Sequence, residues 1–191
     1  NGIPRPMCPI RLTTNRLVIR EFNMDDLDVF ASLCADPLAM RYMGDGSTLS
    51  RDKVEEWIRL CERNYAIKGY GMFSVTLSNG EFIGFCGLGV VPVELIFAYV
   101  PSAWGNGYAT EAARAVLAFG FDGIGLEVVY TTIDQANLAS LRVVTKLGFR
   151  FLETRYDEKP EPYFAYILEK PASSPTVHSP KAMIHACLCS P

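Results

Sequence analysis

A short segment with two glycines, Trp104-Gly105-Asn106-Gly107-Tyr108-Ala109-Thr110, lies where an apolar run gives way to a helical pattern. The first N–H groups of a helix have no partner within the helix, and the helix dipole adds positive potential there. Glycine removes the Cβ atoms that would hold a phosphate away, and it permits positive φ angles. The segment therefore predicts a phosphate-binding site made of main-chain donors, with a plain tight turn as the alternative.

Other phosphate-binding motifs do not match this segment. A dinucleotide-binding fingerprint needs glycine or alanine where Thr110 stands. The Gly-Lys-Ser/Thr ending of a nucleotide-hydrolase loop is absent. These differences argue against hydride transfer and nucleotide hydrolysis.

Histidine-dependent chemistry is disfavoured because His178 and His185 both follow Lys170, in a segment of Pro- and Ser-rich composition. A domain without histidine cannot form a Ser-His-Asp or Cys-His pair, and it lacks metal ligands. The sequence His185-Ala186-Cys187-Leu188-Cys189 has soft-metal side chains, but no second ligand pair stands at zinc-finger spacing. We expect no metal site. The cysteines show no disulfide framework, and three are expected to be reduced core thiols: Cys34, Cys61 and Cys86.

The elements that would position the glycine segment follow from apolar periodicity and from capping residues. Helices are expected from Met24 to Ala35 after the cap Asn23, from the cap Ser50 to about Ile67, after Gly107, and from Asn137 to Gly148. The stripe Trp57, Leu60 and Cys61 is expected to be the buried side of the second helix. Strands are expected at Arg16–Phe22, Met72–Leu77, Phe82–Leu88, Leu95–Val100, Val128–Ile133, about Phe149–Arg155 and Tyr163–Leu168.

Length and charge limit the remaining possibilities. A chain of 191 residues with 49% hydrophobic content can bury one core, so we expect an N-terminal arm (1–10), one domain (11–170) and a tail (171–191). A net charge of -3 offers no basic field for nucleic acid or anionic lipid. No run is long enough to span a membrane, and the expected location is the cytoplasm.

Three stretches together resemble the GNAT superfamily of acetyltransferases, and more narrowly its RimJ/RimL-like branch: Tyr99 to Ala112, Asn137 to Ser140, and Lys146 to Phe149. The opening Leu12 to Arg20 fits the same branch. The resemblance implies an α/β (α+β) fold with a mixed, mostly antiparallel sheet that is splayed between its fourth and fifth strands and flanked by helices. It also implies acetyl-coenzyme A as cofactor and an amine as acceptor, either a protein N-terminus or a small molecule.

The resemblance further implies roles for particular residues. The pantetheine arm would bond to the backbone near Tyr99 and Val100, while Asn137 and Ser140 would flank the arm and the thioester. The pyrophosphate would lie on the amides of Gly105, Asn106, Gly107, Tyr108, Ala109 and Thr110. The sequence departs from the superfamily pattern at Ser102, where Gln or Arg is common, and at Val144, where many members carry a catalytic tyrosine.

The mechanism expected from these residues is direct transfer in one ternary complex. Glu94 is the candidate general base, with bulk solvent as the alternative, and Ser140 would assist the departing sulfur. A backbone N–H near Tyr99 would hold the oxyanion. A module of the same fold that binds acyl-coenzyme A without turnover is the other reading. Acceptor choice is expected to depend on Asp36 to Ser50 and on the segment around Tyr156 to Tyr163, and a homodimer is left open.

Overall fold

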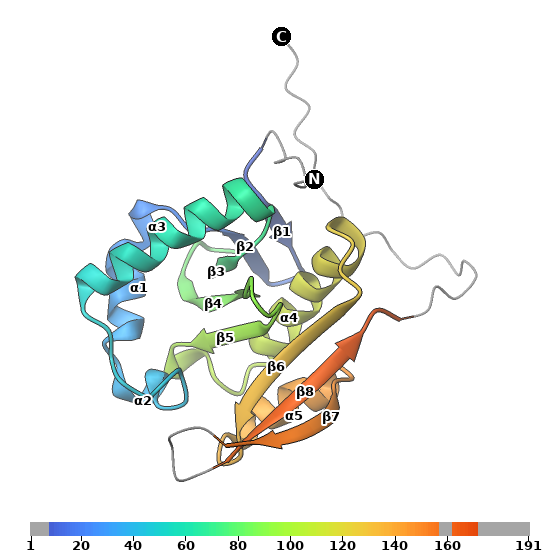
Figure 1. The fold of residues 1–191 in the computed structure, drawn as a ribbon. Helices are drawn as coiled ribbons and strands as arrows, with labels where there is room; N and C mark the ends of the chain where they lie inside the picture. Colours follow the sequence, from blue (N-terminus) through green and yellow to red (C-terminus); the bar gives the residue numbers. More distant parts are fainter. Residues whose placement is uncertain (1–7, 157–161, 172–191) are drawn as a thin grey trace.

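The computed structural model describes residues 8–156 and 162–171, which form two sheets flanked by helices (Figure 1). The larger sheet is antiparallel, with its five strands in chain order: β1 (Arg11–Thr13), β2 (Leu17–Glu21), β3 (Met72–Leu77), β4 (Phe82–Leu88) and β5 (Leu95–Tyr99). The smaller sheet has the order β6-β8-β7, with β6 (Val128–Asp134), β7 (Arg150–Arg155) and β8 (Tyr163–Glu169). All pairings within the two sheets are antiparallel.

Helices lie on both sides of the larger sheet (Figure 1). One group is the 3₁₀ turn η1 (Met24–Asp26), α1 (Leu27–Cys34), α2 (Pro37–Met40) and α3 (Arg51–Lys68). The other group follows β5: the 3₁₀ turn η2 (Pro101–Ala103), α4 (Tyr108–Ala118) and the π-helical turn η3 (Phe119–Gly123). After β6, α5 (Leu138–Lys146) packs against α4. The predicted caps Asn23, Ser50 and Asn137 each accept a hydrogen bond from a backbone N–H in the first turn.

The two sheets are joined at one point and then diverge. A parallel bridge links Glu94 to Tyr130, and the Tyr130 N–H donates to the Val93 carbonyl over 2.9 Å. The Thr131 hydroxyl donates to the Leu95 carbonyl over 3.0 Å, and beyond these residues β5 and β6 are not paired. The predicted splay between the fourth and fifth expected strands is therefore confirmed. These two strands are β5 and β6 in the structure, because β1 was not among the expected strands.

The core contains the three cysteines that the sequence assigns to it. Cys34, Cys61 and Cys86 are buried and reduced. Burial raises the pKa of each thiol to about 12. These thiols are therefore protonated and poor nucleophiles at neutral pH.

The two histidines and the remaining C-terminal cysteines, Cys187 and Cys189, lie outside the described residues. Within the part of the chain that the structure describes, no helix is long and apolar enough to cross a membrane.

Candidate active site

The glycine segment forms the start of α4, as the sequence predicts. Gly105 and Gly107 have φ angles of +78° and +79°, a region that side chains with a Cβ rarely enter. The first bond inside the helix runs from Glu111 N–H to Gly107 C=O over 3.1 Å. The N–H groups of the three preceding residues have no acceptor within the described ranges: Tyr108, Ala109 and Thr110.

The main chain of this turn is accessible to a ligand because no side chain covers it at Gly105 and Asn106. A Cβ built on Gly105 would meet no atom within 4 Å, so that side of the turn is open. The Asn106 side chain is turned inward, and its amide donates to the carbonyls of Ala103 and Trp104, each over 3.1 Å. Free amides, an open approach and a helix N-terminus fit a diphosphate.

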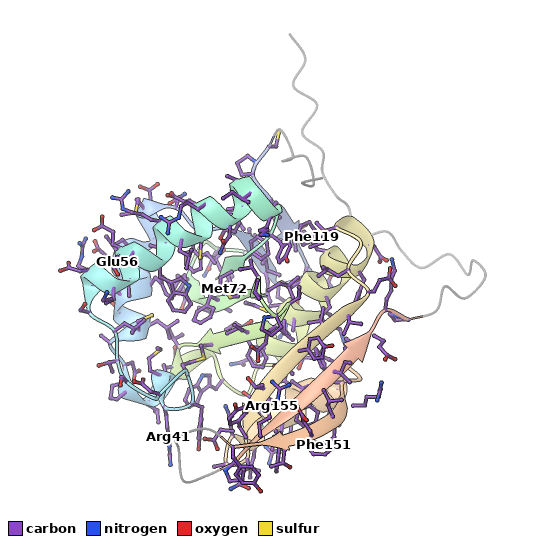
Figure 2. The ribbon with its side chains drawn as sticks, in the orientation of Figure 1. Arg41, Glu56, Met72, Phe119, Phe151 and Arg155 are labelled. Atoms are coloured by element: carbon purple, nitrogen blue, oxygen red, sulfur yellow. The ribbon has the colours of Figure 1, made fainter. Side chains whose placement is uncertain are left out.

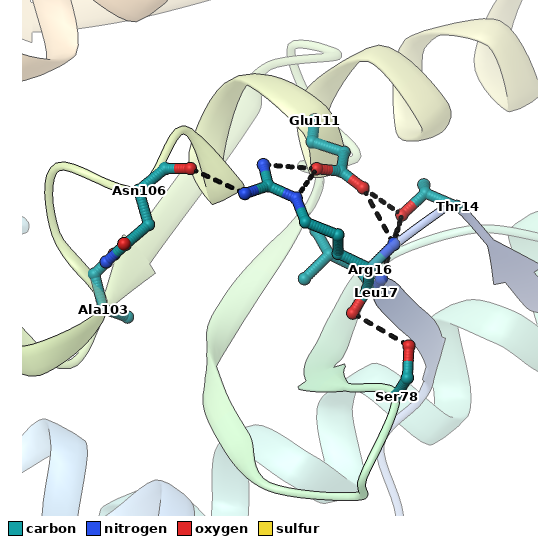
Figure 3. A network of polar contacts seen from close by, with 7 residues as sticks. All are labelled: Thr14, Arg16, Leu17, Ser78, Ala103, Asn106 and Glu111. Carbon is teal, nitrogen blue, oxygen red and sulfur yellow. Dashed lines mark hydrogen bonds and ion pairs between the residues drawn. The ribbon is translucent and has the colours of Figure 1, made fainter.

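Arg16, from the turn between β1 and β2, braces this segment (Figure 3). Its Nη1 donates to the Asn106 carbonyl over 3.0 Å, while its Nε donates to Glu111 over 2.7 Å and its Nη2 lies 2.6 Å from the same carboxylate. The guanidinium also lies over the Tyr108 ring, 4.6 Å from the ring centre. Four contacts from Arg16 therefore tie the glycine segment to the β1–β2 turn, which lies far away in the sequence.

Glu111 is held as a carboxylate within this network. Burial alone would raise its pKa, but hydrogen bonds from the Thr14 hydroxyl and from Arg16 outweigh burial and lower the pKa of Glu111. Arg16 thus neutralises a negative charge that would otherwise stand one turn away from a bound phosphate.

A groove of about 610 Å³ runs beside the turn. Two of its cations, Arg114 and Lys146, have no acidic partner in the described part of the chain. They come from α4 and α5, which pack together. The groove therefore suits the anionic end of a ligand whose diphosphate lies on the α4 amides.

The edge of β5 that faces β6 has unused main-chain groups. The bonds from Val100 N–H to Ile83 C=O and from Gly89 N–H to Glu94 C=O show that the even-numbered residues pair with β4. The odd-numbered residues therefore face the splay. There, Trp104 Nε1 donates to the Tyr99 carbonyl over 2.8 Å. Among the described residues, three main-chain groups of this edge have no hydrogen-bond partner: the Phe97 N–H, the Phe97 C=O and the Tyr99 N–H.

The two residues predicted to contact the pantetheine arm, Tyr99 and Val100, thus differ in their free main-chain groups. Tyr99 keeps a free N–H at the open edge of β5. Val100 donates to Ile83 and accepts from Ala103 N–H, so neither of its main-chain groups faces the splay. Phe97, which the sequence did not single out, takes that position instead.

Glu94 lies at the point where the splay begins, in a pocket of about 230 Å³. The Thr132 hydroxyl donates to its Oε1 over 2.5 Å, and its Oε2 has no hydrogen bond within residues 8–156 and 162–171. Arg155 lines the same pocket from β7. Neither Thr132 nor Arg155 was predicted as a site residue, because only the strand order brings them to Glu94.

Asn137 and Ser140 form the first turn of α5. The Asn137 side-chain oxygen accepts the Ser140 N–H over 3.1 Å, so Asn137 caps the helix. The Ser140 hydroxyl is half-buried and makes no hydrogen bond with the described residues. It is therefore available to a ligand, where a residue that only stabilises its own helix would bond locally. No three His, Cys, Asp or Glu side chains gather as metal ligands in the described ranges.

Comparison with known proteins identifies the kind of molecule that shares this arrangement. Residues 16–150 match the family model described as acetyltransferase (GNAT) domain. The chain is 33% identical over 156 residues to the uncharacterized protein YkkB of Bacillus subtilis, covering 75% of this chain and 87% of that protein. It is 29% identical over 167 residues to FsC-acetyl coenzyme A-N(2)-transacetylase of Aspergillus fumigatus, covering 78% of this chain and 70% of that protein.

A solved structure shares the fold at much lower sequence identity. It is RimL, the ribosomal L7/L12 alpha-N-protein acetyltransferase in complex with coenzyme A, with a TM-score of 0.74 and 11% identity. The likeness covers 84% of this chain and 98% of that chain.

Proposed function

The chain belongs to the GNAT acetyltransferase family, and on that premise we propose that it moves the acetyl group of acetyl-coenzyme A directly to a primary amine within one ternary complex. GNAT enzymes use acetyl-coenzyme A, so the cofactor and the general reaction follow from the family. The observation that best supports the proposed site is that two sets of free main-chain groups follow each other closely along the chain. The amides at the start of α4 and the open edge of β5 are linked by the short turn η2.

The cofactor would be held mainly by the backbone. The α4 amides would hold its diphosphate, and the groove with Arg114 and Lys146 would take the phosphorylated adenosine end. The Phe97 C=O and the Tyr99 N–H would pair with the pantetheine amides as a neighbouring strand does, which leaves the Phe97 N–H free. Asn137 would flank the same arm through its side-chain amide, while its oxygen continues to cap α5.

Bound acetyl-coenzyme A supplies an activated acyl group as a thioester. Glu94 would accept the proton of the incoming ammonium, directly or through water, because most amines are protonated near neutral pH. A free N–H on β5 would hold the developing oxyanion, and the Ser140 hydroxyl would donate to the departing sulfur. No histidine or metal site among the described residues competes for these roles.

Substitution at the two side chains tests the catalytic part of the proposal. Glu94→Gln and Ser140→Ala should each lower kcat by about a hundredfold to ten-thousandfold, the usual worth of general acid–base assistance. Their dissociation constants for acetyl-coenzyme A should change little. Glu81→Gln, an exposed carboxylate in the β3–β4 turn, is the control. Wild-type kcat in both variants from pH 6 to 9, around the α-amine pKa of about 8, would leave proton transfer to solvent.

A panel of amines separates the enzyme from a module that only binds the cofactor. Polyamines, aminoglycosides, amino acids and N-terminal peptides would each be tested for release of the free thiol. Binding of acetyl-coenzyme A without thiol release in any of them would favour the sensing module.

We also propose that residues 11–170 are the whole catalytic unit, because the family match at 16–150 lies inside these bounds. A chain that ends at Lys170 should keep its activity and its melting temperature. Loss of activity in a folded truncated protein would place part of the site beyond Lys170.

A further inference from the structure

The pocket beside Glu94 holds one carboxylate and one guanidinium. Eight residues line it: Pro92, Glu94, Tyr130, Thr131, Thr132, Leu152, Arg155 and Ala165. Among them, Glu94 has the only carboxyl side chain and Arg155 the only basic side chain. The volume of about 230 Å³ is below that of most drug-sized sites, so the pocket suits a small molecule.

The strand register explains why the Arg155 side chain lies at the pocket. Residues directly opposite each other in antiparallel strands point to the same face. Thr132 is opposite Ala165, and Arg155 is opposite Tyr163, which is two residues from Ala165 on β8. The Thr132 and Arg155 side chains therefore stand on one face of the smaller sheet, and Figure 2 shows Arg155 over the part where β8 and β6 lie side by side.

The Arg155 guanidinium has unused donors. Its Nε donates to Glu153 Oε1 over 2.8 Å, while Nη1 and Nη2 donate to no acceptor in the described ranges. The side chain is 42% exposed, so a ligand can reach it. The two Nη groups form the flat end of the guanidinium, whose geometry matches both oxygens of a carboxylate or of another oxyanion.

The two charges together define an acceptor with two charged groups. We propose that the acceptor is a small zwitterionic amine, whose ammonium approaches Glu94 and whose carboxylate, or a similar oxyanion, binds the Nη groups of Arg155. This inference rests on the proposed function, because it gives Glu94 the acceptor amine. It narrows the substrate class from amines in general to amino-acid-like molecules.

Matched acceptors test the inference. Lysine and 1,5-diaminopentane differ by the carboxylate, as do phenylalanine and 2-phenylethylamine, and thiol release gives kcat/KM for each. The wild-type protein should prefer the carboxylate-bearing partner in at least one pair by on the order of tenfold to a hundredfold, the effect of a charge-assisted hydrogen-bond pair. The amide of each amino acid, which keeps the α-amine but loses the negative charge, should behave like the plain amine.

Variants at Arg155 assign the preference to this side chain. Arg155→Met should bring the ratio of the two kcat/KM values close to one, and Arg155→Lys should leave a partial preference, because lysine keeps the charge but not the paired donors. Arg150→Met is the control: Arg150 lies on the same strand and pairs with Glu169 at 2.9 Å, but it does not line the pocket. This control should keep the wild-type ratio.

Three results would overturn the inference. A wild-type ratio of one or below in both pairs would show that the carboxylate is not recognised, while the proposed acetyl transfer would stand. An equal loss on both partners in folded Arg155→Met would show that Arg155 does not read the carboxylate. Absence of thiol release with every amine would overturn the proposed function as well.

Discussion

Substitution of Arg16 by methionine tests whether the brace on the glycine segment controls cofactor binding. The change keeps most of the aliphatic stem but removes the donors to Glu111 and to the Asn106 carbonyl. A hydrogen bond to a charged group contributes about 1.5–3 kcal/mol. Because the Arg16 side chain is 48% exposed, solvent screening reduces that value, and we expect a net loss of about 1–2 kcal/mol. Glu111, left without its cation, adds repulsion toward the diphosphate.

A loss of this size corresponds to a rise of about fivefold to thirtyfold in KM for acetyl-coenzyme A, with kcat nearly unchanged. The assay compares acetyl-coenzyme A with S-acetylpantetheine, which has the same thioester but no diphosphate, and only the former should be affected. Calorimetry with coenzyme A should show the same loss of affinity. Arg51→Met removes a comparable exposed pair with Asp28 and should change neither donor. An equal loss on both donors would refute the reasoning, because the defect would then lie outside diphosphate binding.

Three further predictions concern the same turn and the core. Saturating acetyl-coenzyme A should stabilise the wild-type protein by about 2–4 kcal/mol; Gly107→Val should lose this effect, whereas Gly80→Val, which imposes a similar positive φ strain in a distant hairpin, should keep it. Because the folded pKa of Glu111 is lowered, its stabilising effect is complete above the unfolded pKa of about 4.3 and is lost as the pH falls through the folded pKa. The melting temperature of Glu111→Gln should therefore fall less than that of wild type between roughly pH 5 and pH 3. A protein with Ser at positions 8, 187 and 189 should react with a thiol reagent at about pH 8 only after unfolding, because the remaining thiols are buried with pKa values of about 12: Cys34, Cys61 and Cys86.

Elements with strong local signals could be predicted from the sequence. The hairpin Met72–Leu77 and Phe82–Leu88 has the predicted bounds, since Asn79-Gly80 specifies its turn. α5 begins after Asn137 and ends before Gly148, whose φ is +86°. In each case, a residue with a special conformational or hydrogen-bonding property fixes the boundary.

Elements that depend on tertiary packing were missed or misplaced. β1 is three residues long and is defined by its pairing with β2, which no local sequence pattern predicts. In α3, the expected buried stripe is partly wrong: Leu60 is 44% exposed, and the buried side includes Ile58 and Tyr65. Trp57 and Cys61 do pack on the core, so the predicted stripe is rotated around the helix axis relative to the face that is buried. Periodicity gives the spacing of a buried face, but the packing partner decides its exact direction.

The candidate site likewise has a part that local sequence predicts and a part that depends on tertiary packing. Main-chain donors could be predicted, because the glycines and the helix start that expose them are adjacent in sequence. The side chains around them could not: Arg16 reaches Glu111 from 95 residues away. Arg155 lines the Glu94 pocket because β8 pairs with both β6 and β7 and sets Arg155 and Thr132 on the same face of the smaller sheet. If the backbone holds the cofactor and Arg155 faces the acceptor, the shared reaction is encoded mainly locally and the acceptor specificity is encoded in the topology. Substitutions in the α4 turn should then impair every acceptor equally, whereas those at Arg155 should change the ratio between acceptors.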